Sequence, residues 1–305
     1  MRAFQADAEP PSRAELVRWI DCGSVTVDGL VRRAKEVVRE GTTVEVIPLA
    51  RLTTAVVPDA SVAFDVLHVD DDLVVIVKPS GLVVHPAAGN ETGTLVHGLL
   101  ARGYFREDFV AAVGGEGQHV DAHVRPGIVH RLDKGTSGVM VVARTVFARE
   151  KLKALFAAHD IDRAYDAVVV GEAVEATIRS LHGRHPTERK RFTSRVLRGK
   201  HAVTHVRVSE RFSTRATLVQ CRLETGRTHQ IRVHLAENGT PVLGDPLYGN
   251  APRDPKLRAL GTKLGHQALH ARVLGFVHPR TKKTLHFEAP WPSDFDALVT
   301  ALRRG

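Results

Sequence analysis

Cysteine is scarce in this sequence of 305 residues, which contains only Cys22 and Cys221, far apart and without a Cys-x-x-Cys pair. This scarcity excludes a disulfide framework and a cysteine zinc ribbon, and it fits a reducing compartment. Long apolar runs are also absent, and residues 1–7 lack the apolar core of a secretion signal. We therefore expect a cytoplasmic protein that does not enter a membrane.

The sequence also lacks the common motifs for nucleotides and catalytic metals. It contains no P-loop, no Gly-x-Gly-x-x-Gly after an expected strand, and no His-Glu-x-x-His. His119 and His123 have the i, i+4 spacing of some metal ligands, but they lie in a glycine-rich stretch without a clear third ligand. We interpret them as surface histidines and expect neither a metal nor another cofactor.

Acidic residues are outnumbered by basic ones. The 43 Lys and Arg against 34 Asp and Glu give a formal net charge of +9 at pH 7. A surplus of this sign indicates a polyanion such as RNA as partner. Surface solubility alone produces the same sign in many proteins, so the charge supports RNA binding without deciding it.

The apolar patterns beyond residue 60 predict more strands than helices. Helices are expected at 95–101, 146–156 and 294–302, and residues 103–125 are expected to form a long loop. Strands are expected at 64–69, 73–78, 164–170, 204–208, 216–224, 269–276 and 284–287. Because these strands do not alternate regularly with helices, the pattern predicts an α+β fold.

The first fifty residues predict a small separate module. Residues 12–20 predict a helix with Ser12 as N-cap, residues 25–27 and 43–47 predict strands, and Asp28-Gly29 predicts a hairpin turn. This order resembles an S4 RNA-binding module, although residues 1–11 carry no opening helix of the usual kind. We expect either a shortened module or a true start further upstream. The expected domains are 1–50 for this module, 51–61 for a linker and 62–305 for the main domain.

Asp133 lies between two apolar runs, residues 128–132 and 139–143, and Thr136-Ser137-Gly138 closes the turn that it enters. A carboxylate fixed between two strand-like runs is held rigidly, as a catalytic group must be. Aspartate also commonly ties turns through its side chain, and the spacing alone favours that plainer role.

Five blocks in order resemble the RluA family of pseudouridine synthases. They are residues 78–86, 126–140 with His-Arg-Leu-Asp, 163–171, 224–234 with Arg-Thr-His-Gln-Ile-Arg, and 243–249. Residues 184–187 and 202–205 resemble the branch that modifies large-subunit ribosomal RNA. The resemblance implies a mixed, mainly antiparallel sheet with a central cleft. It also implies a monomer that isomerises uridine in RNA, most specifically in 23S ribosomal RNA.

The resemblance assigns expected roles to several residues. It implies that Asp133 is the essential carboxylate, that Arg232 is its basic partner, and that the ring of Tyr165 stacks on the target base. Their plainer roles are a turn residue, a solvent-facing helix arginine and a core tyrosine. The implied substrate-binding residues are Arg131, which fills the space of the flipped nucleotide, Ile231 and His130. Lys78 is expected to support the strand that it ends.

Phosphate contacts are expected from two groups of basic side chains, either of which also fits an exposed solvated face. In the N-terminal module they are Arg13, Arg18 and Arg33, together with Arg32 and Lys35. In the main domain they are Arg184, Arg189, Lys190, Arg191, Arg195, Arg198 and Lys200.

Two other functions stay open on the sequence alone. One is a non-catalytic RNA-binding or ribosome-assembly factor with the same fold. The other is a glycoside hydrolase, which usually requires two carboxylates, whereas the core motifs offer one. Pseudouridine formation moves the C1′ bond of a uridine from N1 to C5 without net gain or loss of a group, so it needs no cofactor.

Overall fold

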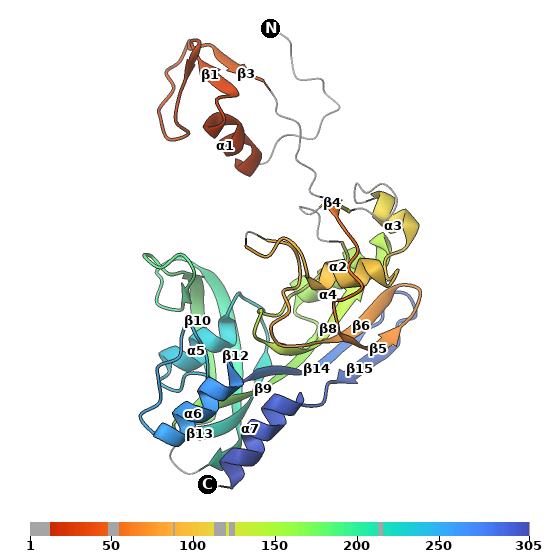
Figure 1. Cartoon of the computed structure of the whole chain (residues 1–305), viewed down its shortest axis with the longest axis vertical. Helices are drawn as coiled ribbons and strands as arrows, with labels where there is room; N and C mark the ends of the chain where they lie inside the picture. The colour runs from red at the N-terminus through yellow and green to blue at the C-terminus, as the bar shows by residue number, and fades with distance from the viewer. Residues whose placement is uncertain are drawn as a thin grey trace. The chain divides into compact units, whose positions relative to one another are not determined.

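The computed structural model describes residues 13–47, 55–87, 89–112, 120–121, 126–212 and 216–304. The chain divides into two compact units, Met1–Thr53 and Thr54–Gly305 (Figure 1). His119, His123 and the side chains of Arg13 and Arg18 lie outside the described residues.

The first unit contains helix α1 (Arg13–Asp21) and a three-stranded antiparallel sheet in the order β2-β1-β3. Strands β1 (Val25–Val27) and β2 (Leu30–Val31) are joined by Asp28 and Gly29, which both have positive φ, as the predicted hairpin turn requires. Strand β3 (Val44–Val46) pairs with β1. The predicted helix, hairpin and third strand are thus confirmed, while the S4 resemblance itself stays a prediction.

The second unit is built on a ten-stranded sheet in the order β11-β10-β12-β13-β9-β14-β8-β6-β5, with β15 paired to β14. The strands are β5 (Asp65–Val69), β6 (Leu73–Lys78), β8 (Ser137–Ala143), β9 (Asp162–Val170), β10 (Ala176–Arg184), β11 (Phe192–Thr193), β12 (Lys200–Phe212), β13 (Ala216–Leu223), β14 (Leu269–Val277) and β15 (Thr284–Glu288). Strands β4 (Ala55–Val56) and β7 (Val120–Asp121) form a separate pair.

Strand β14 joins the two halves of the sheet. It pairs antiparallel with β9 on one side and parallel with β8 on the other, and every other described pair in this sheet is antiparallel. Gly138 permits the close approach to β14, because a Cβ there would lie 2.2 Å from the carbonyl oxygen of Ala271. The mixed, mainly antiparallel sheet of an α+β fold is confirmed.

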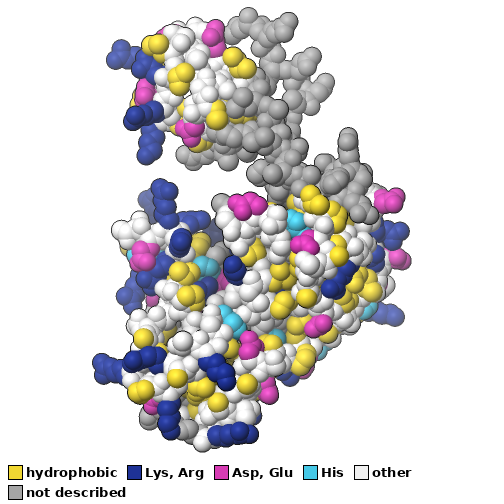
Figure 2. All heavy atoms as spheres, viewed as in Figure 1, with side chains coloured by type: hydrophobic (Ala, Val, Ile, Leu, Met, Phe, Trp, Pro, Cys, Tyr) yellow, Lys and Arg dark blue, Asp and Glu magenta, His cyan; other side chains and the backbone are white. Residues whose placement is uncertain are grey.

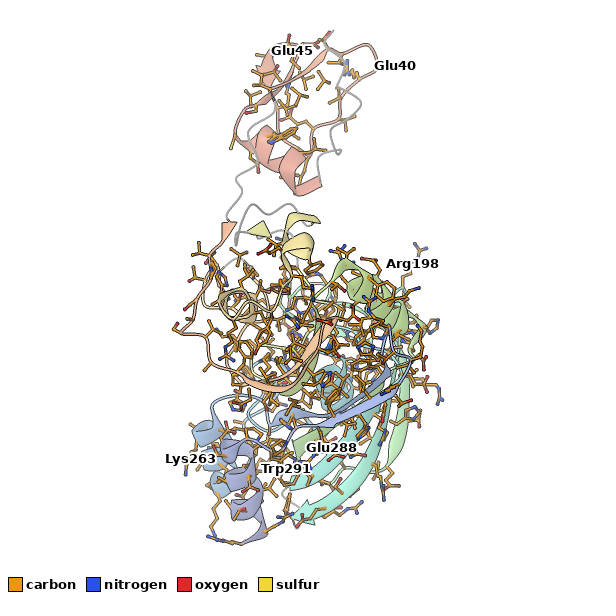
Figure 3. All side chains as sticks on the ribbon, turned by 90° about the vertical axis from the view of Figure 1, so that its right-hand side faces the viewer. Glu40, Glu45, Arg198, Lys263, Glu288 and Trp291 are labelled. Carbon is orange, nitrogen blue, oxygen red and sulfur yellow. The ribbon has the colours of Figure 1, made fainter. Side chains whose placement is uncertain are left out.

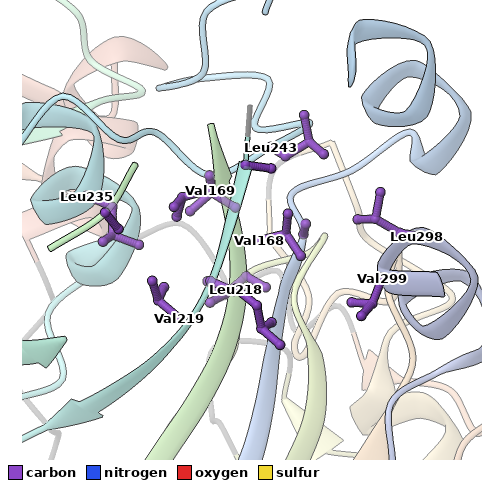
Figure 4. Packing of buried hydrophobic residues seen from close by; sticks show 14 of the residues in the cluster. Val168, Val169, Leu218, Val219, Leu235, Leu243, Leu298 and Val299 are labelled. Atoms are coloured by element: carbon purple, nitrogen blue, oxygen red, sulfur yellow. The ribbon is translucent and has the colours of Figure 1, made fainter. Parts of the chain in front are cut away.

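Helices cover both faces of the sheet. They are α2 (Leu95–Ala101), α3 (Glu107–Ala112), α4 (Val146–Ala158), α5 (Gln230–Glu237), α6 (Pro255–Leu264) and α7 (Ser293–Arg303). Figure 4 shows Leu235 of α5 and Leu298 of α7 on opposite sides of β9 and β13. Consecutive valines in these strands, such as Val168 and Val169, are therefore both buried.

Two parts of the sequence-based prediction are wrong. The stretch 103–125 contains α3 and β7 rather than one loop. Residues 128–132 form no strand, because only Ile128 makes a backbone bridge to β8, at Val142. The ladder stops there because the next free amide of β8, that of Val141, donates to Nε2 of His130 at 3.1 Å instead of to a backbone carbonyl.

Candidate active site

A cavity of about 460 Å³ opens in the second unit. Three stretches of chain and Leu269 of β14 line it: the stretches are residues 129–136 before β8, residues 156–165 from the end of α4 into β9, and residues 223–232 from the end of β13 into α5. Its size is that of sites for small organic groups such as a nucleoside. Six of the predicted site residues, namely Asp133, Tyr165, Arg232, Arg131, Ile231 and His130, all line this cavity.

Arg232 lies between two carboxylates. Its Nη1 donates to Oδ2 of Asp133 at 2.8 Å, while Nε and Nη2 donate to the two oxygens of Asp245 at 2.7 and 2.8 Å. The side chain of Arg232 is 4 % exposed, that of Asp245 is fully buried, and that of Asp133 is 18 % exposed. Asp133 is thus the carboxylate of the two that solvent or a substrate reaches.

The charges of this group support one another. Burial opposes the charge of Arg232, but the hydrogen bonds and negative charges of Asp245 and Asp133 outweigh it and raise the pKa of the guanidinium. Burial opposes the charge of Asp245 as well, but Arg232 and the backbone amides of Leu247 and Tyr248 lower the pKa of that carboxyl. The guanidinium therefore stays charged beside Asp133.

The end of β6 supports the loop that carries Asp133. Lys78 is fully buried, and its Nζ donates to the carbonyl oxygens of Pro79, Leu82 and Lys134 at 2.8, 2.9 and 3.2 Å. Burial lowers the pKa of Lys78 to about 7, against the opposing influence of the Asp133 charge. Three carbonyl acceptors match the three donors of an ammonium group, so Lys78 ties the turn after β6 to the loop that carries Asp133.

The loop before α5 is held by one buried amide. Oε1 of Gln230 accepts from the hydroxyl of Thr225 at 2.8 Å and from the amide of Arg227 at 3.0 Å. Its Nε2 donates to the carbonyl of Val203 and the hydroxyl of Thr204 in β12. These bonds fix the first turn of α5 against the sheet and thereby the position of Arg232.

Tyr165 lies in β9 between Cys221 of β13 and Ala271 of β14. Its ring is partly buried and packs against two hydrophobic clusters of the unit. Burial raises the pKa of its phenol, Arg163 acts in the opposite direction, and Asp133 adds to the rise. The phenol is therefore neutral near pH 7. Ile231, which is 4 % exposed, forms apolar wall beside it.

His130 and Arg131 differ in what they offer a ligand. The ring of His130 stacks on Phe156 with centroids 4.6 Å apart, and its Nε2 accepts from the backbone of β8. Burial, and next the charge of Arg163, lower the pKa of His130 to about 3, so this ring is neutral near pH 7. Its contacts with Phe156 and β8 hold the loop in place. Arg131 is exposed at the cavity, where it is free to contact a charged ligand.

Most of the predicted phosphate contacts that the structure describes lie on exposed surfaces. Arg33 and Lys190 are exposed, and Arg191 is partly buried, with Nη1 donating to Glu188 at 3.0 Å. Figure 2 shows Lys and Arg side chains gathered over the β10–β12 end of the second unit. Arg198 extends from the edge of the same region (Figure 3).

Sequence reasoning missed Asp245, His229 and Tyr248. The blocks containing them were recognised, but nothing in their spacing indicated that Asp245 would bind Arg232 or that His229 would face Asp133. His229 Nε2 lies 3.8 Å from Oδ1 of Asp133, and its Nδ1 lies 2.8 Å from the hydroxyl of Tyr248.

Comparison with known proteins identifies the family. The sequence model for RNA pseudouridylate synthases matches residues 72–237, which include Asp133, Tyr165 and Arg232. The chain belongs to the RNA pseudouridylate synthase family. It is thus an enzyme that isomerises uridine to pseudouridine in RNA, as the blocks around these residues predicted.

Bacterial relatives are similar to the synthase over nearly its full length. The "Ribosomal large subunit pseudouridine synthase D" of Xanthomonas campestris is 45 % identical over 96 % of this chain and 85 % of its own. The protein of the same name from Pseudomonas aeruginosa is 40 % identical over 96 % of this chain and 88 % of its own. An uncharacterized RNA pseudouridine synthase of Bacillus subtilis is 41 % identical over the same share of this chain and 90 % of its own.

Solved structures agree on the fold. Human RNA Pseudouridylate Synthase Domain Containing 4 is 26 % identical, with a TM-score of 0.58, over 78 % of this chain and 93 % of its own. Human RNA Pseudouridylate Synthase Domain Containing 1 is 24 % identical, with a TM-score of 0.57, over 81 % of this chain and 98 % of its own. Within the residues described for the synthase, no helix is long and apolar enough to cross a membrane. Among the same residues, no three His, Cys, Asp or Glu side chains gather as a metal site would require.

Proposed function

We propose that this synthase isomerises uridines in large-subunit ribosomal RNA and that Asp133 is its essential catalytic group. The names of the relatives with 40–45 % identity support the substrate. The observation that carries the catalytic role is the convergence of a reachable carboxylate, a buried guanidinium and an aromatic ring in one cavity.

The proposed chemistry begins when the target nucleotide leaves its stack and enters the cavity, at a cost of a few kcal/mol. Arg131 occupies the vacated space in the RNA. Asp133, which accepts a hydrogen bond from Arg232, either attacks C1′ or assists departure of the base as the C1′–N1 bond breaks. The base then turns, C1′ bonds to C5, the C5 proton leaves, and N1 gains a proton. Atoms and charge therefore balance without a cofactor.

Tyr165 stacks on the turning base in this proposal, with Ile231 and His130 forming the walls beside it. A neutral phenol is a weak base, since its ordinary pKa is about 10 and burial here raises it. Its hydroxyl makes no hydrogen bond with another described residue, so it is available to the substrate. We assign removal of the C5 proton to this hydroxyl, acting on the intermediate rather than on the starting uridine.

The basic side chains of residues 184–200 bind the RNA backbone in this proposal, and those of the first unit add further phosphate contacts. We propose that the synthase acts as a monomer in the cytoplasm, where ribosomal RNA is made in bacteria. Light scattering at micromolar concentration tests the monomer, because a dimer doubles the mass.

The test of the catalytic role is Asp133→Asn, which keeps the shape of the side chain and removes its charge. We expect a folded protein that binds RNA like the wild type and releases no tritium from large-subunit RNA containing 5-tritiated uridine. Asp71→Asn, at a carboxylate whose side chain is 90 % exposed, is the matched control and keeps full activity. Substantial release by the Asp133 variant would show that another group carries the reaction.

A further inference from the structure

His229 holds an unusual position beside the catalytic carboxylate. It precedes α5 with a left-handed φ of 58°, which turns its side chain into the cavity, where it is 16 % exposed. Nε2 of His229 lies 3.8 Å from Oδ1 of Asp133, whereas Arg232 binds Oδ2. The two oxygens of Asp133 therefore have different neighbours.

The hydroxyl of Tyr248 determines which nitrogen of His229 carries the proton. This oxygen lies 2.8 Å from the amide nitrogen of Phe192, which can only donate, and 2.8 Å from Nδ1 of His229. The arrangement that uses every donor has Phe192 donating to Tyr248 and Tyr248 donating to Nδ1. A neutral imidazole then carries its proton on Nε2, which faces Asp133.

The same chain of hydrogen bonds begins in the basic hairpin, residues 184–200, which connects β10 to β12 and contains β11. Phe192 is the first residue of β11, and the guanidinium of Arg184 lies 5.3 Å from the centre of its ring. The guanidinium of Arg191 lies 5.2 Å from the centre of the Tyr248 ring. Two side chains expected to contact RNA thus touch the two residues that orient His229.

We propose that His229 is a positioning residue that orients Asp133, and that Tyr248 makes this orientation depend on the basic hairpin. The proposal rests on the catalytic role of Asp133 proposed above. In the free enzyme His229 and Arg232 direct the carboxylate from two sides. Movement of β11 when RNA binds to the hairpin shifts Tyr248 and His229 together, so substrate binding adjusts the carboxylate before chemistry begins.

Two substitutions of His229 separate positioning from a merely structural role. The amide nitrogen of Gln reaches the place of Nε2, so His229→Gln keeps a donor toward Asp133 and loses the bond to Tyr248. The side chain of Asn ends near the place of Nδ1, so His229→Asn keeps the bond to Tyr248 and loses the donor. The left-handed backbone at this position tolerates Asn better than Gln. Backbone strain alone would therefore make Gln the less active variant, which is the opposite of the result expected here.

The measurements are the single-turnover rate of tritium release and the Kd for RNA. We expect His229→Asn to slow turnover on the order of tenfold, because it removes the donor that faces Oδ1 of Asp133, with Kd unchanged. We expect His229→Gln to stay within about threefold of the wild type, and Tyr248→Phe to fall between the two. The matched controls Tyr104→Phe and His286→Asn, which do not line the cavity, keep wild-type rates.

Three results would overturn the proposal. His229→Asn could turn over faster than His229→Gln, both variants could lose turnover equally, or they could bind RNA more weakly while turning over at the wild-type rate. The first two would make His229 a structural partner of Tyr248, and the third would make it an RNA contact. A wild type without tritium release, or an active Asp133→Asn, would instead refute the proposed function, so the two failures are distinct.

Discussion

Replacing Arg232 by Lys tests whether the guanidinium holds the site together. Arg232 makes three charged hydrogen bonds of 2.7–2.8 Å, two to Asp245 and one to Asp133. A lysine ammonium is a compact point charge on a flexible stem and lacks the planar fork that binds Asp245 with two parallel bonds. We expect Lys to keep an ion pair with Asp245 and to lose the bond to Asp133.

The structure sets the size of the effect. Losing one partner of a buried ion pair costs about 3–5 kcal/mol, and the retained charge places Arg232→Lys at the lower end, near 3 kcal/mol. Losing the bond to Asp133, worth about 1.5–3 kcal/mol, slows turnover by about 10- to 100-fold. Urea unfolding followed by circular dichroism measures the first quantity, and single-turnover tritium release measures the second.

Arg272→Lys is the control, because Arg272 is 32 % exposed and lies 3.7 Å from Glu288, a surface pair whose loss costs less than about 1 kcal/mol. The free energy of unfolding of Arg232→Lys could instead lie within about 0.5 kcal/mol of the wild-type value, and its single-turnover rate within about threefold. The bonds from Arg232 to two carboxylates would then not be what holds and activates Asp133.

Three further predictions concern stability and RNA binding. Lys78→Met leaves three backbone carbonyl groups without the donor from Lys78, so we expect urea unfolding to show a loss of about 2 kcal/mol, and an unchanged midpoint would contradict this. Burial, and next the nearby His182, lower the pKa of His234 to about 4. Between pH 6.5 and pH 4, His234 is therefore protonated in the unfolded chain but not in the folded protein. The free energy of unfolding therefore falls as the pH falls from 6.5 to 4. His234→Gln reduces that slope by up to about 1.4 kcal/mol per pH unit in urea titrations, and parallel curves would refute the assignment. Removal of residues 1–50 weakens RNA binding and lowers the slope of log Kd against log salt concentration, and an unchanged slope would show that this unit does not contact phosphates.

The fold could be predicted from the sequence where an element is apolar along almost its whole length. Strand β6 and helix α2 were predicted with their observed bounds, Leu73–Lys78 and Leu95–Ala101, because their side chains are almost all buried. Strand β10 (Ala176–Arg184) was missed because only one of its residues is buried and its sequence does not alternate between apolar and polar side chains. Burial, not propensity, is what the pattern reports.

The site shows the same limit in another form. Asp133 and Arg232 are 99 positions apart, and the sequence indicated both only through the short blocks around them. Asp245 could not be assigned from its block, because its role depends on a turn that directs its carboxylate back toward α5. Likewise, the stretch 128–132 has the composition of a strand, but the His130 ring takes the amide that would continue the ladder.

The place of β14 in the sheet decides when Asp133 and Arg232, the proposed catalytic pair, can meet. Asp133 lies beside β8, in one half of the sheet, and Arg232 follows β13, in the other half. Strand β14 pairs with both halves and begins only at Leu269. While the protein is being made, the carboxylate and its guanidinium therefore remain on unconnected half-sheets until nearly nine-tenths of the chain has been translated. A nascent chain that has not yet reached Leu269 thus has no strand to bring Asp133 and Arg232 together.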